Sequence, residues 1–165
     1  MSTRATVRIG FGYDVHRFDP NRPLILGGIE VPGGPGLLGH SDADVLLHAL
    51  TDALLGALAL RDIGHHFPDT DPAYKGADSS LLLTQAYQLV QAKGWQLGNA
   101  DCTLVAEQPK LNPHIPRMQA RIASLLGCAE EDISIKATTH EQMGAFGRKE
   151  GMAAYASVLV HRIDG

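Results

Sequence analysis

The chain has 165 residues, of which 44% are hydrophobic, 19% charged and 5% aromatic. These proportions are typical of a globular domain, and a chain of this length can fold without disulfides or a structural metal. We therefore expect residues 1–165 to form one domain, in which any metal site serves function. A net charge of −4 argues against nucleic acid as a partner. The two cysteines, Cys102 and Cys128, form no CxxC motif and predict neither a zinc knuckle nor a disulfide framework.

Two features bear on the cellular location. No apolar run approaches the ~20 residues of a membrane span, and the first eight residues lack the apolar segment of a signal peptide. We therefore expect a protein of the bacterial cytoplasm with no membrane partner, although a chain trimmed of a transit peptide would look the same.

The first part of the chain predicts two strands and a helix. Residues 6–15 and 24–31 have the composition of strands, and a turn at residues 19–21 between them suggests a hairpin. A glycine-rich loop follows at residues 32–39. Ser41 is a suitable N-cap for a helix that would run to Leu60.

The remaining elements alternate between helices and strands. Residues 61–78 lack any period and are long for a connection, which is typical of functional loops. Gly94 would end a helix over residues 79–93, and Gly127 would end one over residues 113–126. Strands are expected at residues 95–106, 133–137 and 152–162, and a loop at residues 138–151. This alternation predicts an α/β or α+β domain.

Asp14 and His16 form the first candidate site. Residues two apart on a strand face the same side, so this carboxylate and imidazole would lie side by side. A third ligand is His48, which lies on a helical stripe with Asp44 and Asp52. Three such ligands with one open position are typical of catalytic zinc. The motif is weak by itself, because a helical His is more often a structural or solvated side chain. Two other histidines compete as ligands, His65 and His66.

Three further segments are ambiguous on their own. His40 and Ser41 follow the glycine loop and precede a helix, where a phosphate could bind, although the loop is no Walker A motif and Ser41 could simply cap the helix. Thr138, Thr139 and Glu141 leave a strand and could bind phosphate and Mg²⁺, or could form a solvated loop. The acids of residues 62–71 suit a ribose diol or an ordinary turn.

In their order and spacing, these segments resemble the 2-C-methyl-D-erythritol 2,4-cyclodiphosphate synthase family over essentially the whole chain. The matching segments are residues 10–18, 39–56, 62–71, 75–79 and 136–139. The resemblance implies a small domain with a mixed sheet of four to five strands and helices on one face. It also implies a homotrimer whose active sites lie between subunits.

The resemblance also implies an activity. The substrate, a small cytidine diphosphate compound, is 4-diphosphocytidyl-2-C-methyl-D-erythritol 2-phosphate, which is cyclised with release of CMP. Zn²⁺ or another divalent metal would be held by Asp14, His16 and His48, and Mg²⁺ or Mn²⁺ by Glu141 together with the diphosphate. His40 and Thr139 would stabilise the transition state. The implied substrate-binding residues are Ser41, Asp62, Ile63, Gly64, Phe67, Pro68, Asp69, Thr70, Asp71, Ala106, Lys110, Leu111, Asn112, Ala137, Thr138 and Arg148. Among the implied contacts, segment 106–112 and Ala137 match the cytosine pocket.

Some positions depart from the family pattern or extend it. Ala145 stands where most members have an aromatic residue, and His140 stands where Thr is common. Arg148 matches a position that in some relatives lines a central cavity for isoprenoid phosphates. Two other function classes remain as alternatives: a zinc hydrolase that would give a linear product, and a module that would bind CDP without turnover.

Overall fold

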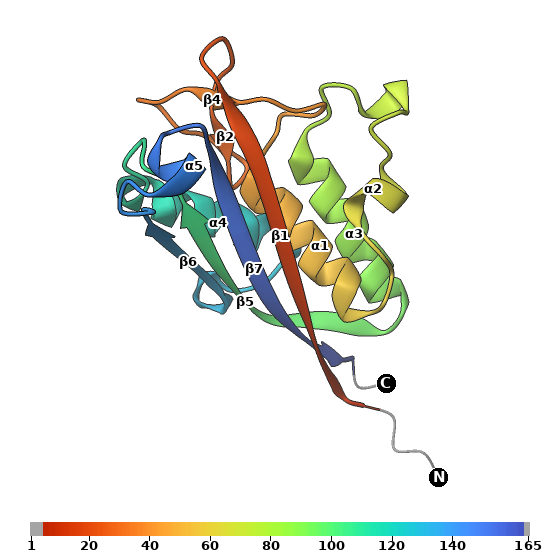
Figure 1. The fold of residues 1–165 in the computed structure, drawn as a ribbon. Helices are drawn as coiled ribbons and strands as arrows, with labels where there is room; N and C mark the ends of the chain where they lie inside the picture. Colours follow the sequence, from red (N-terminus) through yellow and green to blue (C-terminus); the bar gives the residue numbers. More distant parts are fainter. Residues whose placement is uncertain (1–4, 164–165) are drawn as a thin grey trace.

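A five-stranded mixed sheet is the framework of residues 5–163, which are the residues that this computed structural model describes (Figure 1). The strand order is β4-β1-β7-β5-β6. Strands β5 and β6 run parallel, and the other neighbouring pairs are antiparallel. The strands are β1 (Val7–Asp19), β4 (Gly36–Leu37), β5 (Trp95–Val105), β6 (Ile133–Thr138) and β7 (Gly151–Arg162). A separate two-stranded sheet pairs β2 (Ile25–Leu26) with β3 (Ile29–Glu30).

Three long helices cover one face of this sheet and leave the opposite face open (Figure 1). They are α1 (Val45–Ala57), α3 (Ser79–Ala92) and α4 (Ile115–Leu126), and their buried leucines and isoleucines form the core with the inner side of the sheet. The short elements are α2 (Ile63–His66), α5 (Gly144–Gly147) and the 3₁₀ turns η1 (Pro72–Tyr74), η2 (Asn112–His114) and η3 (Glu130–Asp132). No helix among the described residues is long and apolar enough to cross a membrane.

Helix α1 packs directly on the backbone of β1. A Cβ atom on Gly10 would lie 1.8 Å from the carbonyl oxygen of Ala53, and one on Gly12 would lie 1.8 Å from that of Ala49. Only glycine allows this approach. The side chains that follow on the same side of β1 are those of Asp14 and His16, so the two glycines bring the metal motif up to α1.

Most of the expected elements are confirmed within one or two residues. These are the helices over 79–93 and 113–126 and the strands over 95–106, 133–137 and 152–162. The first strand begins one residue later than predicted, at Val7, and ends four residues later, at Asp19. The fold class is also confirmed, with five strands and the long helices on one face.

The predicted hairpin between residues 6–15 and 24–31 is wrong. Gly27 and Gly28 have φ values of +61° and +75°, so the second segment turns back on itself as β2 and β3. A pair of glycines with positive φ is the typical centre of a two-residue hairpin turn. The strand that pairs with the end of β1 is instead β4, with Phe18 opposite Leu37.

The start of the first long helix also differs from the prediction. Ala43 has a φ of +58°, which no helix can include, and the N-cap is Asp44, whose side chain accepts a hydrogen bond from Leu47 N. Ser41 instead accepts one from Ala43 N. The helix ends at Ala57, three residues before the predicted Leu60.

Candidate functional site

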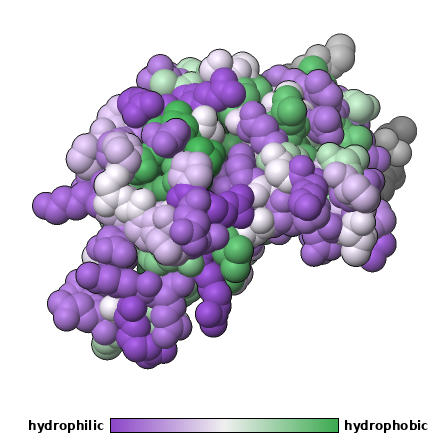
Figure 2. Space-filling view, turned by 90° about the horizontal axis from the view of Figure 1, so that it is seen from above, coloured by the Kyte–Doolittle hydropathy of each residue, from purple (hydrophilic) through white to green (hydrophobic). Residues whose placement is uncertain are grey.

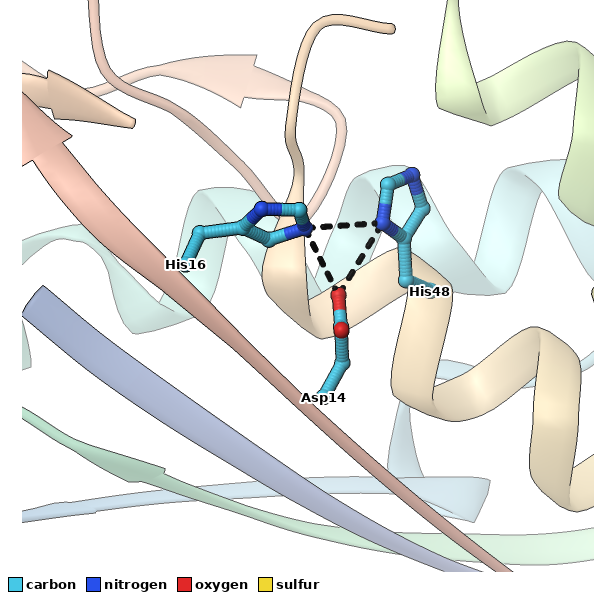
Figure 3. A group of neighbouring side chains, drawn as sticks. All are labelled: Asp14, His16 and His48. Atoms are coloured by element: carbon cyan, nitrogen blue, oxygen red, sulfur yellow. Dashed lines mark hydrogen bonds and ion pairs between the residues drawn. The ribbon is translucent and has the colours of Figure 1, made fainter. Parts of the chain in front are cut away.

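Asp14, His16 and His48 converge where β1 faces α1 (Figure 3). Asp14 Oδ2 lies 2.9 Å from His16 Nε2 and 3.0 Å from His48 Nδ1, and the two nitrogens are 3.2 Å apart. All three side chains are largely buried, with exposed fractions between 12% and 26%. Among residues 5–163 this is the group of His, Cys, Asp or Glu whose ligand atoms are close enough to share a metal ion. The competing histidines, His65 and His66, lie outside it.

The hydrogen bonds of His16 show that the group fits a cation. Its Nδ1 lies 2.9 Å from the carbonyl oxygen of Leu38, which can only accept, so Nδ1 carries the proton and Nε2 presents its lone pair to Asp14 Oδ2. Lone pairs that face one another repel unless a cation or an extra proton lies between them. Ligand atoms of a tetrahedral zinc ion lie roughly 3.3 Å apart, close to the observed spacing.

Opposing influences set the charge of the group. Burial disfavours ionisation of Asp14, but the adjoining imidazoles of His16 and His48 outweigh it and lower the pKa of this carboxyl to about 2. Burial also opposes protonation of His16, but Asp14 outweighs it and raises the pKa of this imidazole, because a protonated Nε2 can donate a hydrogen bond to the carboxylate. Asp14 is therefore ionised at neutral pH, as a metal ligand must be, whereas metal binding has to displace any proton on His16.

The other acids of the predicted stripe do not join the metal group. Asp44 is fully buried and accepts hydrogen bonds from Gly27 N at 3.0 Å and Gly28 N at 2.7 Å, and burial raises its pKa to about 6. Asp52 accepts a hydrogen bond from Ile63 N at 2.7 Å. Asp44 therefore fastens the β2–β3 turn to α1, and Asp52 fastens the start of α2.

A cavity of about 340 Å³ opens beside the three ligands. Arg22 holds the chain on either side of the lining residue His40, because its two terminal nitrogens donate to the carbonyl oxygens of Gly39 and Ser41. Segment 61–78 supplies several of the lining residues. The lining residues are Asp14, His16, His40, Ser41, His48, Ile63, Gly64, Phe67, Asp69, Tyr74 and Leu82. The structure thus brings the metal motif, the residues after the glycine loop and part of the long loop into one site.

A second cavity, of about 410 Å³, collects the residues expected to hold cytosine. Its lining residues are Ala106, Glu107, Pro109, Lys110, Leu111, Asn112, Pro113, Ala137, Thr138 and Thr139. Thr139 and Glu141 also line a neighbouring hollow at the exit of β6. The loop there is held by Glu107, whose Oε1 accepts hydrogen bonds from His140 N at 2.9 Å and Gln142 N at 3.3 Å.

The two cavities have no lining residue in common, so the predicted site residues of the described chain fall into two groups. His40 lies in the first and Thr139 in the second. Several predicted residues line neither of them: Asp62, Pro68, Thr70, Asp71, Glu141 and Arg148. Asp62 and Asp71 cap α2 and η1, and Arg148 pairs with Glu150 at 3.0 Å.

The two departures from the family pattern lie in the same loop, at residues 140–146. The ring of His140 meets that of Phe146 edge to face, with centroids 5.1 Å apart. Ala145 and Phe146 line a small cavity with His16 and Arg17.

The end of the molecule that is uppermost in Figure 1 presents a mostly hydrophilic surface with smaller hydrophobic areas (Figure 2).

Comparison with known proteins identifies the family. The model of the YgbB family matches residues 7–161. This chain belongs to the YgbB family. A relative from Parabacteroides distasonis, named 2-C-methyl-D-erythritol 2,4-cyclodiphosphate synthase, is 57% identical over 157 residues, which cover 95% of this chain and 98% of the relative. The resemblance seen in the sequence is therefore confirmed.

Solved structures show the same fold. Bifunctional IspDF from Campylobacter jejuni matches with a TM-score of 0.93 and 48% identity, over 96% of this chain and 43% of that chain. A complex of IspF from Plasmodium falciparum with CDP matches with a TM-score of 0.85 and 32% identity, over 98% of this chain and all of that chain (100%).

In this YgbB family member, sequence reasoning missed several residues at the two cavities. Tyr74 and Leu82 line the metal cavity, and Glu107 holds the loop after β6. Tyr74 belonged to a segment already singled out as a long loop. Glu107 lay within the segment assigned to cytosine, but its contacts with residues 140 and 142 are tertiary. Leu82 has the helical spacing of an ordinary core residue, so no local signal marks it.

Proposed function

We propose that this protein cyclises 4-diphosphocytidyl-2-C-methyl-D-erythritol 2-phosphate to 2-C-methyl-D-erythritol 2,4-cyclodiphosphate and releases CMP. This is a phosphorus–oxygen lyase reaction of the non-mevalonate route to isoprenoid precursors, here assigned to the bacterial cytoplasm. The observation that carries the proposal is the convergence of Asp14, His16 and His48 beside a cavity that also presents His40 and Ser41. The name of the Parabacteroides distasonis relative supports the choice of substrate.

The reaction needs little acid–base chemistry from the protein. An oxygen of the 2-phosphate attacks the β-phosphorus, the bond from that phosphorus to the oxygen shared with the α-phosphate breaks, and CMP leaves with the electron pair. The second pKa of a phosphate monoester is near ~6, so the nucleophile is already largely ionised at neutral pH. The residues must therefore bring two anionic arms of one substrate together and stabilise the transition state electrostatically.

Each part of the site has a task in this proposal. Asp14, His16 and His48 hold Zn²⁺ or another divalent metal, and Glu141 holds Mg²⁺ or Mn²⁺ with the diphosphate. When bound, these cations supply Lewis-acid polarisation of phosphoryl oxygens and neutralise the diphosphate and the departing CMP. His40 and Thr139 stabilise charge in the transition state. Segment 61–78 closes over the substrate as a lid, because water would give a linear product.

The remaining residues bind the ends of the substrate. Ser41 and residues of segment 62–71 hold the phosphates, the methylerythritol and the ribose, and the second cavity holds cytosine. The residues proposed for these contacts are Ser41, Asp62, Ile63, Gly64, Phe67, Pro68, Asp69, Thr70, Asp71, Ala106, Lys110, Leu111, Asn112, Ala137 and Thr138. Arg148 is proposed as a further contact to a phosphate. The IspF complex with CDP supports a cytidine diphosphate ligand.

A homotrimer with active sites between subunits completes the proposal. Two observations support it. The metal cavity and the second cavity share no lining residue, which agrees with a site that neighbouring chains join. The open face of the sheet carries exposed apolar side chains, among them Ile9 (79% exposed) and Phe11 (64% exposed), and a patch of this kind is typical of a protein interface.

Phosphorus NMR tests the reaction. The protein is incubated with the cytidine diphosphate substrate, Zn²⁺ and Mg²⁺, beside a His48→Ala control. We expect the two coupled signals of a cyclic diphosphate together with CMP, and we expect both to disappear in the variant. A linear phosphorylated product would favour the hydrolase, and binding of CDP without turnover would favour the binding module. Unchanged cyclisation after segment 61–78 is shortened would refute the lid.

Subunit mixing tests the shared active site. His48→Ala removes a residue of the metal cavity and Thr139→Ala one of the second cavity, so each variant alone is expected to be inactive. Mixed trimers contain some sites in which both halves are intact. Activity should therefore return when the two variants are unfolded and refolded together, and sedimentation should give the mass of three chains. An inactive mixture of the correct mass would exclude sites shared between subunits.

A further inference from the structure

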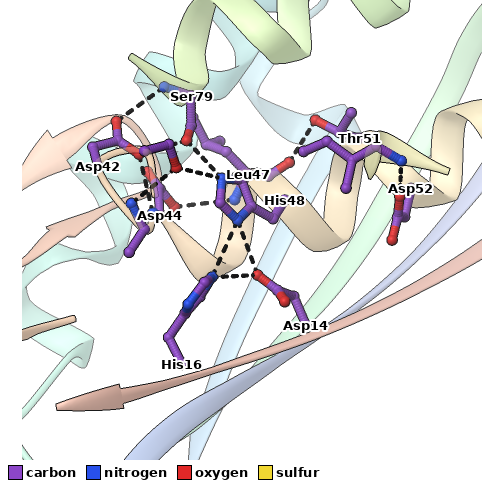
Figure 4. A network of polar contacts seen from close by, with 12 residues as sticks. Asp14, His16, Asp42, Asp44, Leu47, His48, Thr51, Asp52 and Ser79 are labelled. Atoms are coloured by element: carbon purple, nitrogen blue, oxygen red, sulfur yellow. Dashed lines mark hydrogen bonds and ion pairs between the residues drawn. The ribbon is translucent and has the colours of Figure 1, made fainter. Parts of the chain in front are cut away.

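The outer nitrogen of His48 points away from the metal group (Figure 4). His48 Nε2 lies 2.8 Å from Ser79 Oγ and 3.2 Å from Ser41 Oγ. Ser79 is fully buried and is the first residue of α3. The metal ligand is therefore held on its far side by a hydroxyl that belongs to another helix.

The partners of Ser79 fix the direction of this hydrogen bond. Its hydroxyl donates to Asp42 Oδ1, while the other carboxylate oxygen, Asp42 Oδ2, accepts from Ser79 N at 2.9 Å. An ionised carboxylate can only accept, so the single hydroxyl hydrogen of Ser79 is directed to Asp42. Ser79 Oγ then acts as the acceptor toward His48, whose Nε2 must carry the proton. The lone pair of this imidazole is consequently on Nδ1, which faces Asp14 Oδ2 at 3.0 Å.

We propose that Ser79, oriented by Asp42, is a positioning residue that fixes the tautomer and ring orientation of the metal ligand His48. The inference rests on the proposed metal site and extends it by a layer of contacts. His16 has an equivalent support in the carbonyl oxygen of Leu38. With both supports in place, each imidazole turns an unprotonated nitrogen toward Asp14.

The physical need for such a support follows from imidazole chemistry. A neutral imidazole has two tautomers, and the wrong one would direct an N–H group at the metal. A hydrogen-bonded carboxylate further out also raises the basicity of the ligand. Removal of partners in this layer typically weakens metal binding by about 10–100-fold. Ser79 and Asp42 should therefore affect metal affinity although neither belongs to the metal group.

The same network links the metal ligand to the proposed lid. Ser79 follows segment 61–78 directly, and the end of that segment is bonded to the loop before α1. Gly76 N donates to His40 O at 2.8 Å, and Asp42 N donates to Ala77 O at 3.1 Å. The orientation of His48 therefore depends on the position of residues 76–79, at the end of the proposed lid.

Zinc affinity tests the inference with a matched control. Ser79→Ala removes the hydroxyl that faces His48. Ser80→Ala makes the same change one residue later, at a side chain that is also buried (3% exposed) and lies outside the metal group. Competition with a chelator should show zinc bound about 10–100-fold more weakly by Ser79→Ala, and within about twofold of wild type by Ser80→Ala.

Nitrogen NMR of the metal-free proteins gives a second readout that does not depend on activity. We expect the proton of His48 on Nε2 in the wild type and in Ser80→Ala, and a mixture of tautomers in Ser79→Ala. If Ser79→Ala does not fold, Asp42→Asn serves instead, because an amide can donate to Ser79 Oγ and release its hydroxyl hydrogen toward His48.

The outcomes separate the two proposals. A wild type that binds zinc, together with a Ser79→Ala or Asp42→Asn variant that binds it as tightly and keeps the same tautomer, would overturn this inference alone. A wild type that binds no zinc would overturn the proposed metal site, and this inference with it.

Discussion

The approach of α1 to β1 at Gly12 controls both stability and the metal site. A Cβ atom at this position would lie 1.8 Å from the carbonyl oxygen of Ala49, whereas Cβ atoms keep at least 3.0 Å from such neighbours. Both groups belong to the backbone, so no rotamer change relieves the clash. Gly12→Ala must therefore push α1 away from β1 by about 1.2 Å.

The expected cost has a structural and a functional part. Extra methyl groups in packed interiors usually lower the free energy of unfolding by about 1–3 kcal/mol, and a backbone clash belongs at the upper end, at about 3 kcal/mol. A domain of ordinary stability remains folded after such a loss. His48 moves with α1 while Asp14 and His16 stay on β1. Metal sites tolerate a deviation of only about ±0.2 Å in the distances between metal and ligand atoms. Zinc affinity should therefore fall at least about 10-fold.

Gly56→Ala is the matched control for this prediction. Gly56 lies on the exposed side of α1, and the nearest heavy atom to a Cβ there is Phe11 O at 3.9 Å. Replacing a helical glycine by alanine should stabilise the protein by about 0.5–1 kcal/mol. Urea unfolding gives the stability of both variants, and chelator competition gives their zinc affinity. A Gly12→Ala protein as stable as wild type, or with unchanged zinc affinity, would refute the role assigned to this contact.

Three further predictions concern buried groups. Asp44→Ala leaves three backbone N–H groups without their acceptor, which should lower the free energy of unfolding by about 3–5 kcal/mol in urea; a loss below about 1 kcal/mol would contradict this. Burial raises the pKa of Asp44 to about 6, so protonated Asp44 contributes fully to the free energy of unfolding below pH 4. This contribution, about 3 kcal/mol, is lost as the pH rises through 6. The stability difference between wild type and Asp44→Asn should show this slope, and a flat difference would count against it. Burial raises the pKa of Cys102 to about 12, so a thiol reagent at pH 8 should modify only Cys128 before unfolding; equal rates would exclude this.

Local signals were enough for most of the secondary structure. The helix that ends before Gly94 and the helix that ends before Gly127 each combine a regular apolar period with a glycine of positive φ, +78° and +64°. The hairpin was misassigned because Gly27 and Gly28 lie inside an apolar run that reads as one strand. A second strand beside β1 was therefore expected in the wrong segment.

The candidate site shows where sequence reasoning stops. Asp14 and His16 follow from the period of a strand, and His48 from its place on a helix. The same stripe suggested Asp44 and Asp52, but these acids bond backbone N–H groups of other segments. Which acid meets a metal and which meets an amide depends on tertiary contacts. The separation of the predicted residues into two cavities is also a tertiary property.

The hydrogen bonds of the acidic side chains near the metal group bear on how an acidic protein can bind the proposed substrate, which carries several phosphates. Three acids of segment 42–52 lie near the metal group, and each is engaged with the protein. Asp42 bonds Ser79 and the N–H of Asp44, Asp44 bonds the β2–β3 turn, and Asp52 bonds the start of α2. Carboxylates satisfied by N–H groups direct their charge into the scaffold. Asp14 is then the acid of the candidate metal group, and a divalent cation bound there would outweigh its single charge. Attraction for phosphate would thus be produced locally, so the net charge of −4 is no obstacle to the proposed reaction.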